Sequence, residues 1–217
     1  MTYIFQPARY ELERQIRRHA DVVKGRVLDV GSGSHPRYRG FFKNCSEYIK
    51  LDIEGVPDVD VIGSAENIPL PNESFDSIVS TQVIGDVYDL HKVFAEFYRV
   101  LKPGGILFLT EGFSDELHDE PYDFWRFTEH SLRRLSEDAG FTVEMVEKRG
   151  GYFSVRSQMT LRYCIDRFDI YRRSWRKTFS ALAKAYGLFM LWRDSRDTAE
   201  VNRHFTHGYL LMARKNI

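Results

Sequence analysis

The residues best suited to chemistry in this 217-residue chain form a glycine turn after a strand-like run, at 25–34. Residues 27–30 are almost all apolar, as expected of a strand that is covered on both faces. Gly31 and Gly33 then allow a tight turn and let backbone N–H groups approach a ligand closely. Asp52 ends the next apolar run, 19 positions after Gly33, about the spacing of the ribose-binding acid in a nucleotide-binding βαβ unit. These residues predict a nucleotide-binding turn.

The turn lacks one feature of a dinucleotide site. A Gly-x-Gly-x-x-Gly fingerprint would need its third glycine where this chain has Pro36. Asp29 precedes the turn, and its carboxylate would repel a pyrophosphate but attract a cation. S-adenosylmethionine carries a sulfonium and an ammonium group and no phosphate, so the turn favours this cofactor over NAD. The alternative is a turn that binds nothing.

The elements that position the turn alternate between strands and helices. Strands are expected near residues 26–30, 47–52, 59–63, 74–80, 106–110, 141–146 and 209–213, and helices at 8–23, 89–101 and 128–139. Residues 102–105, Lys-Pro-Gly-Gly, are expected to stop the second helix, and Thr128 to cap the third. The alternation predicts a doubly wound, Rossmann-like α/β fold with a seven-stranded, mostly parallel sheet, whose ligand lies at the carboxyl ends of the strands.

Length predicts a single domain over residues 1–217, with residues 153–200 as a helical insertion before the last strand. No apolar run reaches the roughly 18 residues of a membrane-spanning helix. The N-terminus lacks the charged and apolar regions of a signal peptide. Cys45 and Cys164 are too few for a disulfide framework, so we expect a cytoplasmic protein.

Charge is unevenly distributed although the net charge is zero. Residues 1–150 hold 18 Lys and Arg and 26 Asp and Glu, whereas residues 151–217 hold 13 and 5. The basic part predicts a surface for an anionic partner, or an attraction between the two parts. The expected helix at 174–192 is basic at its start and apolar at helical spacing, which suits an anionic membrane surface. The alternatives are a core helix or a homodimer contact.

Five segments together resemble the class I S-adenosylmethionine-dependent methyltransferases, and within them the broad type 11 group. These segments are 27–33, 51–52, 63–69, 74–80 and 99–105, and the resemblance covers roughly residues 25–146. It implies that the glycines lie against the methionine and ribose, that Asp29 holds the ammonium side, and that Asp52 binds the ribose hydroxyls. The residues at 64–65 would border the adenine, although the group usually has an aspartate at position 64. The expected cofactor-binding residues are Asp29, Gly31, Ser32, Gly33, Asp52, Ile53, Ser64, Ala65, Thr81 and Gln82.

Two further segments resemble a subset of these enzymes that is associated with cell-surface polysaccharide genes. One is the turn at 34–39, and the other is the His-x-x-Pro-Tyr-Asp-Phe-Trp-Arg-Phe-Thr run at 118–128. The resemblance implies O-methylation of a small molecule or a glycan, and the basic helix expected at 174–192 would suit a lipid-linked saccharide. Residues 113–128, here called the acceptor segment, would then choose the substrate.

The acceptor segment also contains candidate catalytic bases. Methyl transfer is an in-line displacement at the sulfonium carbon, so the protein must align the nucleophile and remove its proton. A sugar hydroxyl is a poor nucleophile near neutral pH, and His118 has a suitable ordinary pKa for a base. Glu120, Asp123 and Asp119 are the alternatives. We expect no metal site, because neighbouring residues do not form a ligand set without partners elsewhere.

Aromatic residues in the acceptor segment have two interpretations. Tyr122, Phe124 and Trp125 either stack on a sugar face or pack the segment down. Nucleic-acid base methylation is not expected, because residues 80–84 lack the Asn/Asp-Pro-Pro-aromatic run typical of amino-methylating enzymes. RNA ribose methylation and a non-catalytic, S-adenosylmethionine-binding scaffold stay open as alternatives.

Overall fold

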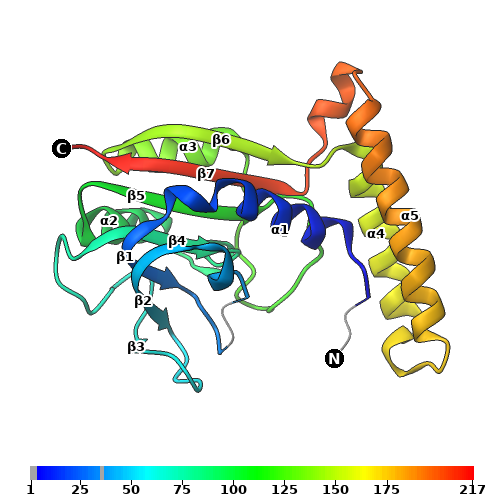
Figure 1. Cartoon of the computed structure of the whole chain (residues 1–217), viewed down its shortest axis with the longest axis horizontal. Coiled ribbons are helices and arrows are strands. Elements are labelled where there is room, and N and C mark those ends of the chain that lie inside the picture. The colour runs from blue at the N-terminus through cyan, green and yellow to red at the C-terminus, as the bar shows by residue number, and fades with distance from the viewer. Residues whose placement is uncertain (1–3, 35–36) are drawn as a thin grey trace. The chain divides into compact units, whose positions relative to one another are not determined.

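The computed structural model describes residues 4–34 and 37–217, which form two compact units (Figure 1). Residues 16–148 and 208–217 form the sheet unit, and residues 149–207 with the chain up to residue 15 form the helical unit. Pro36, the position of the missing glycine, lies outside the described residues. The single domain expected over 1–217 stays a prediction, because compactness does not decide whether the two units fold together.

The sheet unit contains a seven-stranded mixed sheet in the order β3-β2-β1-β4-β5-β7-β6. The strands are β1 (Lys24–Val30), β2 (Asn44–Asp52), β3 (Val61–Ile62), β4 (Phe75–Thr81), β5 (Leu101–Gly112), β6 (Phe141–Arg149) and β7 (Gly208–Lys215). β1 pairs in parallel with β2 and β4, and β4 with β5, whereas β7 is antiparallel to β5. The predicted doubly wound, mostly parallel sheet is therefore confirmed, and the carboxyl ends of its central strands lie along one edge.

Helices α2 (Leu90–Val100) and α3 (Glu129–Asp138) pack on this sheet. Phe94 and Phe97 of α2 are fully buried in the same cluster as Leu28 of β1 and Leu107 of β5. The α2 helix begins where the Asp89 side chain accepts a hydrogen bond from the Lys92 backbone N–H, at 3.2 Å. The α3 helix begins at the predicted cap, since Thr128 and Ser131 form a reciprocal capping box.

Two boundaries differ from the sequence expectation. Helix α1 (Pro7–His19) ends before residue 23, because residues 20–22 tighten into a 3-10 turn in which the Val23 N–H bonds to the Ala20 carbonyl. The β5 strand begins at Leu101, before the expected residue 106, but its pairing with β4 skips residues 102–105, and α2 ends at Val100 as these residues predict. Lys102 holds this stretch beside β4 through an ion pair with Asp76, at 2.8 Å.

The helical unit consists mainly of α4 (Tyr152–Arg167) and α5 (Arg176–Arg196), which confirms the two helices predicted within 153–200. Its small core contains Ile4, Leu161, Ile165, Ile170 and Ala183. Asp194 near the end of α5 accepts hydrogen bonds from three backbone N–H groups at the start of α4, from residues 151, 153 and 154. The positive end of a helix dipole favours a carboxylate, so Asp194 joins the end of α5 to the start of α4.

The insertion of the helical unit occurs between two neighbouring strands. β6 and β7 are adjacent in the sheet, and the contacts Thr142–Asn216 and Glu144–Arg214 show that they run antiparallel. At the other end of this pair, the residue 207 N–H donates to the Arg149 carbonyl oxygen at 2.9 Å. Residues 150–207 therefore leave and re-enter the sheet at adjacent points. Within the described residues, no helix is both long enough and apolar enough to cross a bilayer.

Candidate functional site

The glycine turn at the end of β1 is held by the neighbouring strand. The Gly31 and Ser32 N–H groups both donate to the Leu51 carbonyl oxygen, at 2.8 and 3.2 Å. Gly31 has a φ of +72°, and a side chain there would clash with Val83, whose atoms lie 2.4 Å from the position of a Cβ. Gly33 has a φ of +58° and open space around it. The turn therefore requires glycine for its conformation and leaves room above Gly33.

Asp52, at the end of β2, reaches back to this turn. One carboxylate oxygen accepts the Gly33 N–H at 2.8 Å, and the other accepts the Glu54 N–H at 3.1 Å. A carboxylate offers about four acceptor positions, so Asp52 keeps capacity for further donors. The next residue, Ile53, is 71% exposed. The structure thus brings Asp52 together with the glycine turn, as the sequence spacing predicts.

Asp29 is buried below the turn and bonds to a residue that the sequence did not single out. The Tyr48 hydroxyl donates to the Asp29 carboxylate at 2.7 Å. Burial, with a smaller contribution from the Asp52 charge, raises the pKa of Asp29 to about 7, although the Tyr48 hydrogen bond opposes the rise. Both residues line a cavity of about 130 Å³, together with Gly31, Ser32, Arg37, Tyr38, Phe42, Val79 and Thr81. A cation in this cavity would stabilise the ionised carboxylate.

Ser64 and Ala65 follow β3. The Ser64 hydroxyl accepts the Glu66 N–H at 3.1 Å, which leaves its own proton to donate. Ala65 is buried in the sheet core. The Glu66 side chain in turn accepts the Asp89 N–H at 2.9 Å and so fixes this loop to the start of α2.

The end of β4 carries two of the expected cofactor residues. Thr81 lines the cavity, and its buried hydroxyl has no hydrogen-bond partner among residues 4–34 and 37–217. Gln82 has a φ of +57°, and its N–H donates to the Thr110 carbonyl oxygen at 2.8 Å. A non-glycine residue at positive φ and an unpaired buried hydroxyl are both typical of a ligand site.

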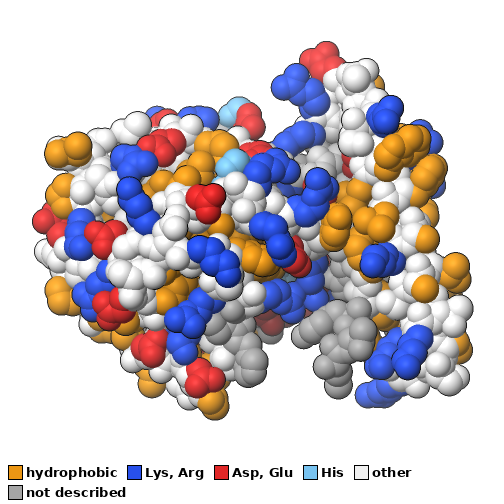
Figure 2. All heavy atoms as spheres, in the orientation of Figure 1, with side chains coloured by type: hydrophobic (Ala, Val, Ile, Leu, Met, Phe, Trp, Pro, Cys, Tyr) orange, Lys and Arg blue, Asp and Glu red, His pale blue; other side chains and the backbone are white. Residues whose placement is uncertain are grey.

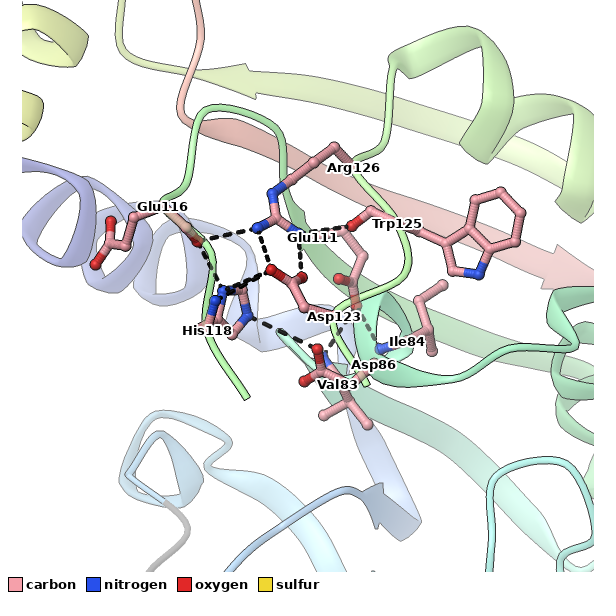
Figure 3. Close-up of polar contacts among 9 residues, drawn as sticks. All are labelled: Val83, Ile84, Asp86, Glu111, Glu116, His118, Asp123, Trp125 and Arg126. Atoms are coloured by element: carbon pink, nitrogen blue, oxygen red, sulfur yellow. Dashed lines mark hydrogen bonds and ion pairs between the residues drawn. The ribbon is translucent and has the colours of Figure 1, made fainter. Parts of the chain in front are cut away.

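Glu111 at the end of β5 joins this edge to the acceptor segment (Figure 3). Its buried carboxylate accepts the N–H groups of Val83 and Ile84, at 3.2 and 3.1 Å. Gly85 follows, and its carbonyl accepts the N–H groups of residues 124 and 125, both at 3.0 Å. The loop after β4 therefore packs against Gly31 through Val83 and binds the acceptor segment through the Gly85 carbonyl. The sequence analysis missed Glu111, because its partners are distant in the chain.

Arg126 organises the acceptor segment. Its guanidinium pairs with both oxygens of Asp123, one of them at 2.8 Å, and also donates to the Glu116 carbonyl oxygen at 3.0 Å. The Arg126 hydrogen bond holds the pKa of Asp123 at about 2, against a small opposing effect of burial. Asp123 is thus fixed as a paired carboxylate and also accepts the His118 N–H at 3.1 Å. This pairing suits a residue that positions His118 better than one that takes up a proton.

His118 lies between two carboxylates with a defined tautomer (Figure 3). Its Nδ1 is 3.0 Å from the Glu116 carbonyl oxygen, which can only accept, so Nδ1 carries the proton and Nε2 is free to accept one. Nε2 lies 3.8 Å from an Asp86 oxygen, contributed by the 3-10 turn Ile84–Asp86 after β4. Burial lowers the pKa of His118, but the Glu116 hydrogen bond and the charges of Asp123 and Asp86 outweigh it and raise that pKa. His118 is a stronger base than an ordinary histidine.

A metal site at residues 118–119 would need a further ligand from another part of the chain, and Asp86 lies in a position to be that ligand. Ligand atoms of Asp86, His118 and Asp119 all lie within 4.8 Å of one another. One histidine and two carboxylates are a donor set that divalent metals accept. The expected absence of a metal site stays a prediction. Glu120, the remaining candidate base, is exposed.

A hollow of about 590 Å³ lies beside this network. Trp125 and Tyr88 form part of its wall, with His91, Arg126 and Arg134 among the polar residues around it. The Trp125 indole N–H donates to the Val87 carbonyl oxygen at 3.0 Å, which fixes the ring while 41% of the residue stays exposed. Trp125 therefore packs the segment down and stays partly exposed, and stacking on a sugar stays a prediction.

Residues 28–109 match the family described as Methyltransferase domain. The chain is 43% identical over 109 residues to a malonyl-[acyl-carrier protein] O-methyltransferase of Yersinia pestis, covering 42% of this chain and 39% of that protein. It is 38% identical over 135 residues to a ubiquinone/menaquinone biosynthesis C-methyltransferase of Brucella anthropi, covering 58% and 45%. The chain thus spans less than half the length of these curated relatives.

Two solved structures share the fold. The [4+2]-cyclase SpnF has a TM-score of 0.62 at 21% identity, covering 94% of this chain and 81% of that one. The phosphoethanolamine N-methyltransferase 2 of Haemonchus contortus, in complex with S-adenosyl-L-methionine, has a TM-score of 0.56 at 18% identity, covering 96% and 52%. With the family match, residues 28–109 are similar to S-adenosylmethionine-dependent methyltransferases, and the sheet around them has the class I fold. The polysaccharide-associated subset stays a prediction.

Proposed function

We propose that this protein methylates a hydroxyl oxygen of a small-molecule or glycan acceptor, with S-adenosylmethionine as the methyl donor. The observation that carries the proposal is His118, a histidine of fixed tautomer and raised pKa. It lies on a segment that Glu111 and Gly85 tie to the cofactor turn. The paragraphs below treat the cofactor, the base and the acceptor in turn.

The residues at the carboxyl edge fit S-adenosylmethionine. The buried Asp29 carboxylate, with a pKa of about 7, favours a cationic group in the adjoining cavity. Asp52 has acceptor capacity left for ribose hydroxyls, and the Ser64 hydroxyl has a proton to donate toward the adenine. Thr81 offers an unpaired hydroxyl. When bound, the cofactor supplies an electrophilic methyl group.

His118 is the base in this proposal. Nε2 accepts the proton of the acceptor hydroxyl as the oxygen attacks, while Nδ1 stays bonded to the Glu116 carbonyl. The Asp86 carboxylate, 3.8 Å from Nε2, stabilises the imidazolium that forms. Asp123, held by Arg126, accepts the His118 backbone N–H and lies 3.6 Å from Nδ1 of the ring. A neutral His118 is required, so the reaction is expected to speed up as the pH rises through the raised pKa.

Aromatic surface on and around the acceptor segment supports a saccharide acceptor. Tyr88, Tyr122, Phe124 and Trp125 are all exposed, and the Phe124 ring lies in edge contact with the rings of Tyr88, at 5.4 Å, and Tyr122, at 6.4 Å. Such rings can stack on the apolar face of a sugar while the charged groups around the hollow bind its hydroxyls. The hollow of about 590 Å³ has the size of ordinary small-molecule sites.

Other acceptors have support of their own. One relative is named an O-methyltransferase and another a C-methyltransferase, so a carbon acceptor is the main competitor. A carbon acceptor would use the same base. RNA ribose methylation also requires only a base and an aligned hydroxyl. One protein of similar fold is titled a [4+2]-cyclase. Transfer of the methyl group therefore has to be measured directly.

The test is methyl transfer from S-adenosylmethionine with a labelled methyl group. The acceptors are nucleotide sugars, lipid-linked saccharides, quinone precursors and RNA, each incubated with the whole protein. We expect label in an ether on a saccharide or other small hydroxyl compound. Label on carbon or in RNA would redirect the proposal, and cofactor binding with no transfer to any acceptor would contradict it.

A further inference from the structure

The hairpin of α4 and α5 leaves many large apolar side chains in solvent (Figure 2). Its core holds five residues, among them only one from α5. Seven large apolar residues are instead about half exposed or more: Met159, Tyr163, Phe168, Trp175, Leu182, Phe189 and Trp192. Isolated exposed apolar residues are ordinary, but this many within one small hairpin indicates a surface that is covered in function.

The α5 helix has a buried side and an exposed apolar side. Ala183 and Gly187 face inward, and a side chain at Gly187 would clash with Phe5 at 2.5 Å. Trp175, Leu182 and Phe189 recur every seven residues, so they lie along one line of the helix surface, and each is about half exposed or more. The exposed apolar side, Trp175, Leu182, Phe189 and Trp192, is here called the α5 apolar stripe.

Positive charge surrounds the α5 apolar stripe. Residues 152–196 contain ten Lys and Arg but three Asp and Glu. One of those acids, Asp194, is engaged by the N-terminus of α4 and does not offset the basic groups. Arg196 continues the seven-residue series and lies over the Trp192 ring, 5.7 Å from its centre. Lys177 and Arg172 lie exposed at the other end of the stripe, Arg172 with an exposed ion pair to Asp169 at 3.6 Å.

We propose that the α5 apolar stripe and its basic flanks dock the protein on an anionic lipid bilayer surface. Indole and phenyl rings with leucine insert at the level of the lipid headgroups, and lysine and arginine then reach the lipid phosphates. The described helices are too polar to span a bilayer, so the contact lies in the plane of the membrane. This inference is independent of which acceptor is methylated.

Charge and side-chain type favour a bilayer over other partners. A second copy that presented the same hairpin would bring like charges together, which opposes a symmetric contact. A nucleic acid would pair with the arginines, but it would give Leu182 and Met159 no apolar contact. An anionic bilayer satisfies the basic and the apolar residues at once.

The test is sedimentation of the full-length protein with vesicles of phosphatidylcholine alone or with about a third of phosphatidylglycerol. We expect binding to the anionic vesicles to be at least tenfold tighter, and to weaken with added salt. Lipids brominated in the acyl chains should quench tryptophan emission, and Trp192→Phe should reduce that quenching. Quenching separates insertion of the stripe from simple adsorption of charge.

Two triple variants separate the apolar and basic contributions. Leu182→Ser/Phe189→Ser/Trp192→Ser should reduce binding at least tenfold. Arg172→Gln/Lys177→Gln/Arg196→Gln should reduce it about a hundredfold, because each basic group near the surface contributes roughly a fivefold effect. Ile62→Ser and Lys43→Gln/Lys92→Gln/Arg134→Gln, in the sheet unit, are the matched controls and should bind as the unchanged protein. Circular dichroism and thermal melting check that each variant folds.

Three results would overturn the inference. One is the absence of retention on anionic vesicles at low salt. Another is full retention by either triple variant. The third is a stable dimer in light scattering without lipid that the apolar triple variant disperses, since the stripe would then belong to a second copy.

Discussion

The carboxyl edge of β1, β2 and β4 and the acceptor segment lie in the same unit but are built in different ways. At the edge, the decisive groups are backbone N–H groups, two glycines and carboxylates at strand ends, such as Gly31 and Asp52. The acceptor segment has little regular structure and is held by side chains, with Arg126 and Glu111 as its anchors. One region depends on strand geometry, and the other on specific side-chain pairs.

The difference explains what similarity to other proteins reveals. The family match ends at residue 109, before the acceptor segment begins. Strand-end geometry is shared by proteins that differ in their substrates, whereas a side-chain network can change with each acceptor. Similarity to relatives therefore helps to identify the cofactor. The acceptor has to be inferred from the residues of this chain. The following predictions test that division, from the largest expected effect to the smallest.

His118→Ala should lower kcat by about 10² to 10⁴-fold, because a positioned base contributes that much to proton transfer. The affinity for S-adenosylmethionine, measured by calorimetry, should stay the same, since His118 belongs to the acceptor segment. His130→Ala, an exposed histidine on α3, is the control and should keep full activity. Unchanged turnover in His118→Ala would remove this residue from the mechanism.

Asp52→Ala should weaken S-adenosylmethionine binding about a hundredfold, because it removes charge-assisted hydrogen bonds and also frees the Gly33 turn. At saturating cofactor, kcat should change little. Glu54→Ala is the control, because its backbone N–H can still bond to Asp52. A large loss of kcat with normal cofactor affinity would show that the two regions are not separable.

Asp29 should make cofactor affinity depend on pH. Its pKa of about 7 is expected to fall when a cationic group binds beside it, so binding releases a proton. The affinity should therefore rise about tenfold between pH 6 and pH 8, as the ionised fraction rises. Asp29→Asn should bind more weakly at pH 8 and lose this pH dependence in calorimetry. A flat profile in the unchanged protein would contradict the role of Asp29.

Asp86→Asn should shift the pH profile of kcat/KM. The Asp86 charge raises the pKa of His118, so its loss should move the rising limb to lower pH. Asp89→Asn, three residues further along the chain at the start of α2, is the matched control. A shift to higher pH, or none, would mean that Asp86 does not act on His118.

Removal of divalent metal should have the smallest effect. We expect activity after EDTA treatment and gel filtration to equal that of the untreated protein. Loss of activity that Mn²⁺ or Mg²⁺ restores, and that Asp119→Asn reproduces, would instead make Asp86, His118 and Asp119 a metal site.

Much of the sheet and its edge could be predicted because the signals are local. Strand patterns, the glycine turn and the Thr128 cap each lie within a few residues of sequence. The Tyr48–Asp29 and Glu111–Val83 contacts join residues 19 and 28 positions apart, and no local pattern marks them. The position of Asp86 opposite His118 depends on the loop after β4, so the sequence alone placed no partner beside that histidine.

The start of β5 is predicted too late, because Leu101 already pairs with Phe75 of β4. Proline and glycine at 103–105 do interrupt that pairing, which resumes only where Ile106 pairs with Ser77, and Gly104 has a φ of +75°. Local sequence therefore marks the irregularity but not the pairing on either side of it.

The adjacent exit and entry of residues 150–207 make the helical unit an exchangeable part of the chain. About 60 residues connect β6 to β7, two adjacent antiparallel strands that a short hairpin loop could also connect. Closing so long a loop costs only roughly 2 kcal/mol more than closing a loop of four residues. Evolution can therefore remodel this appendage, and an engineer can graft another in its place, while the seven strands keep their order.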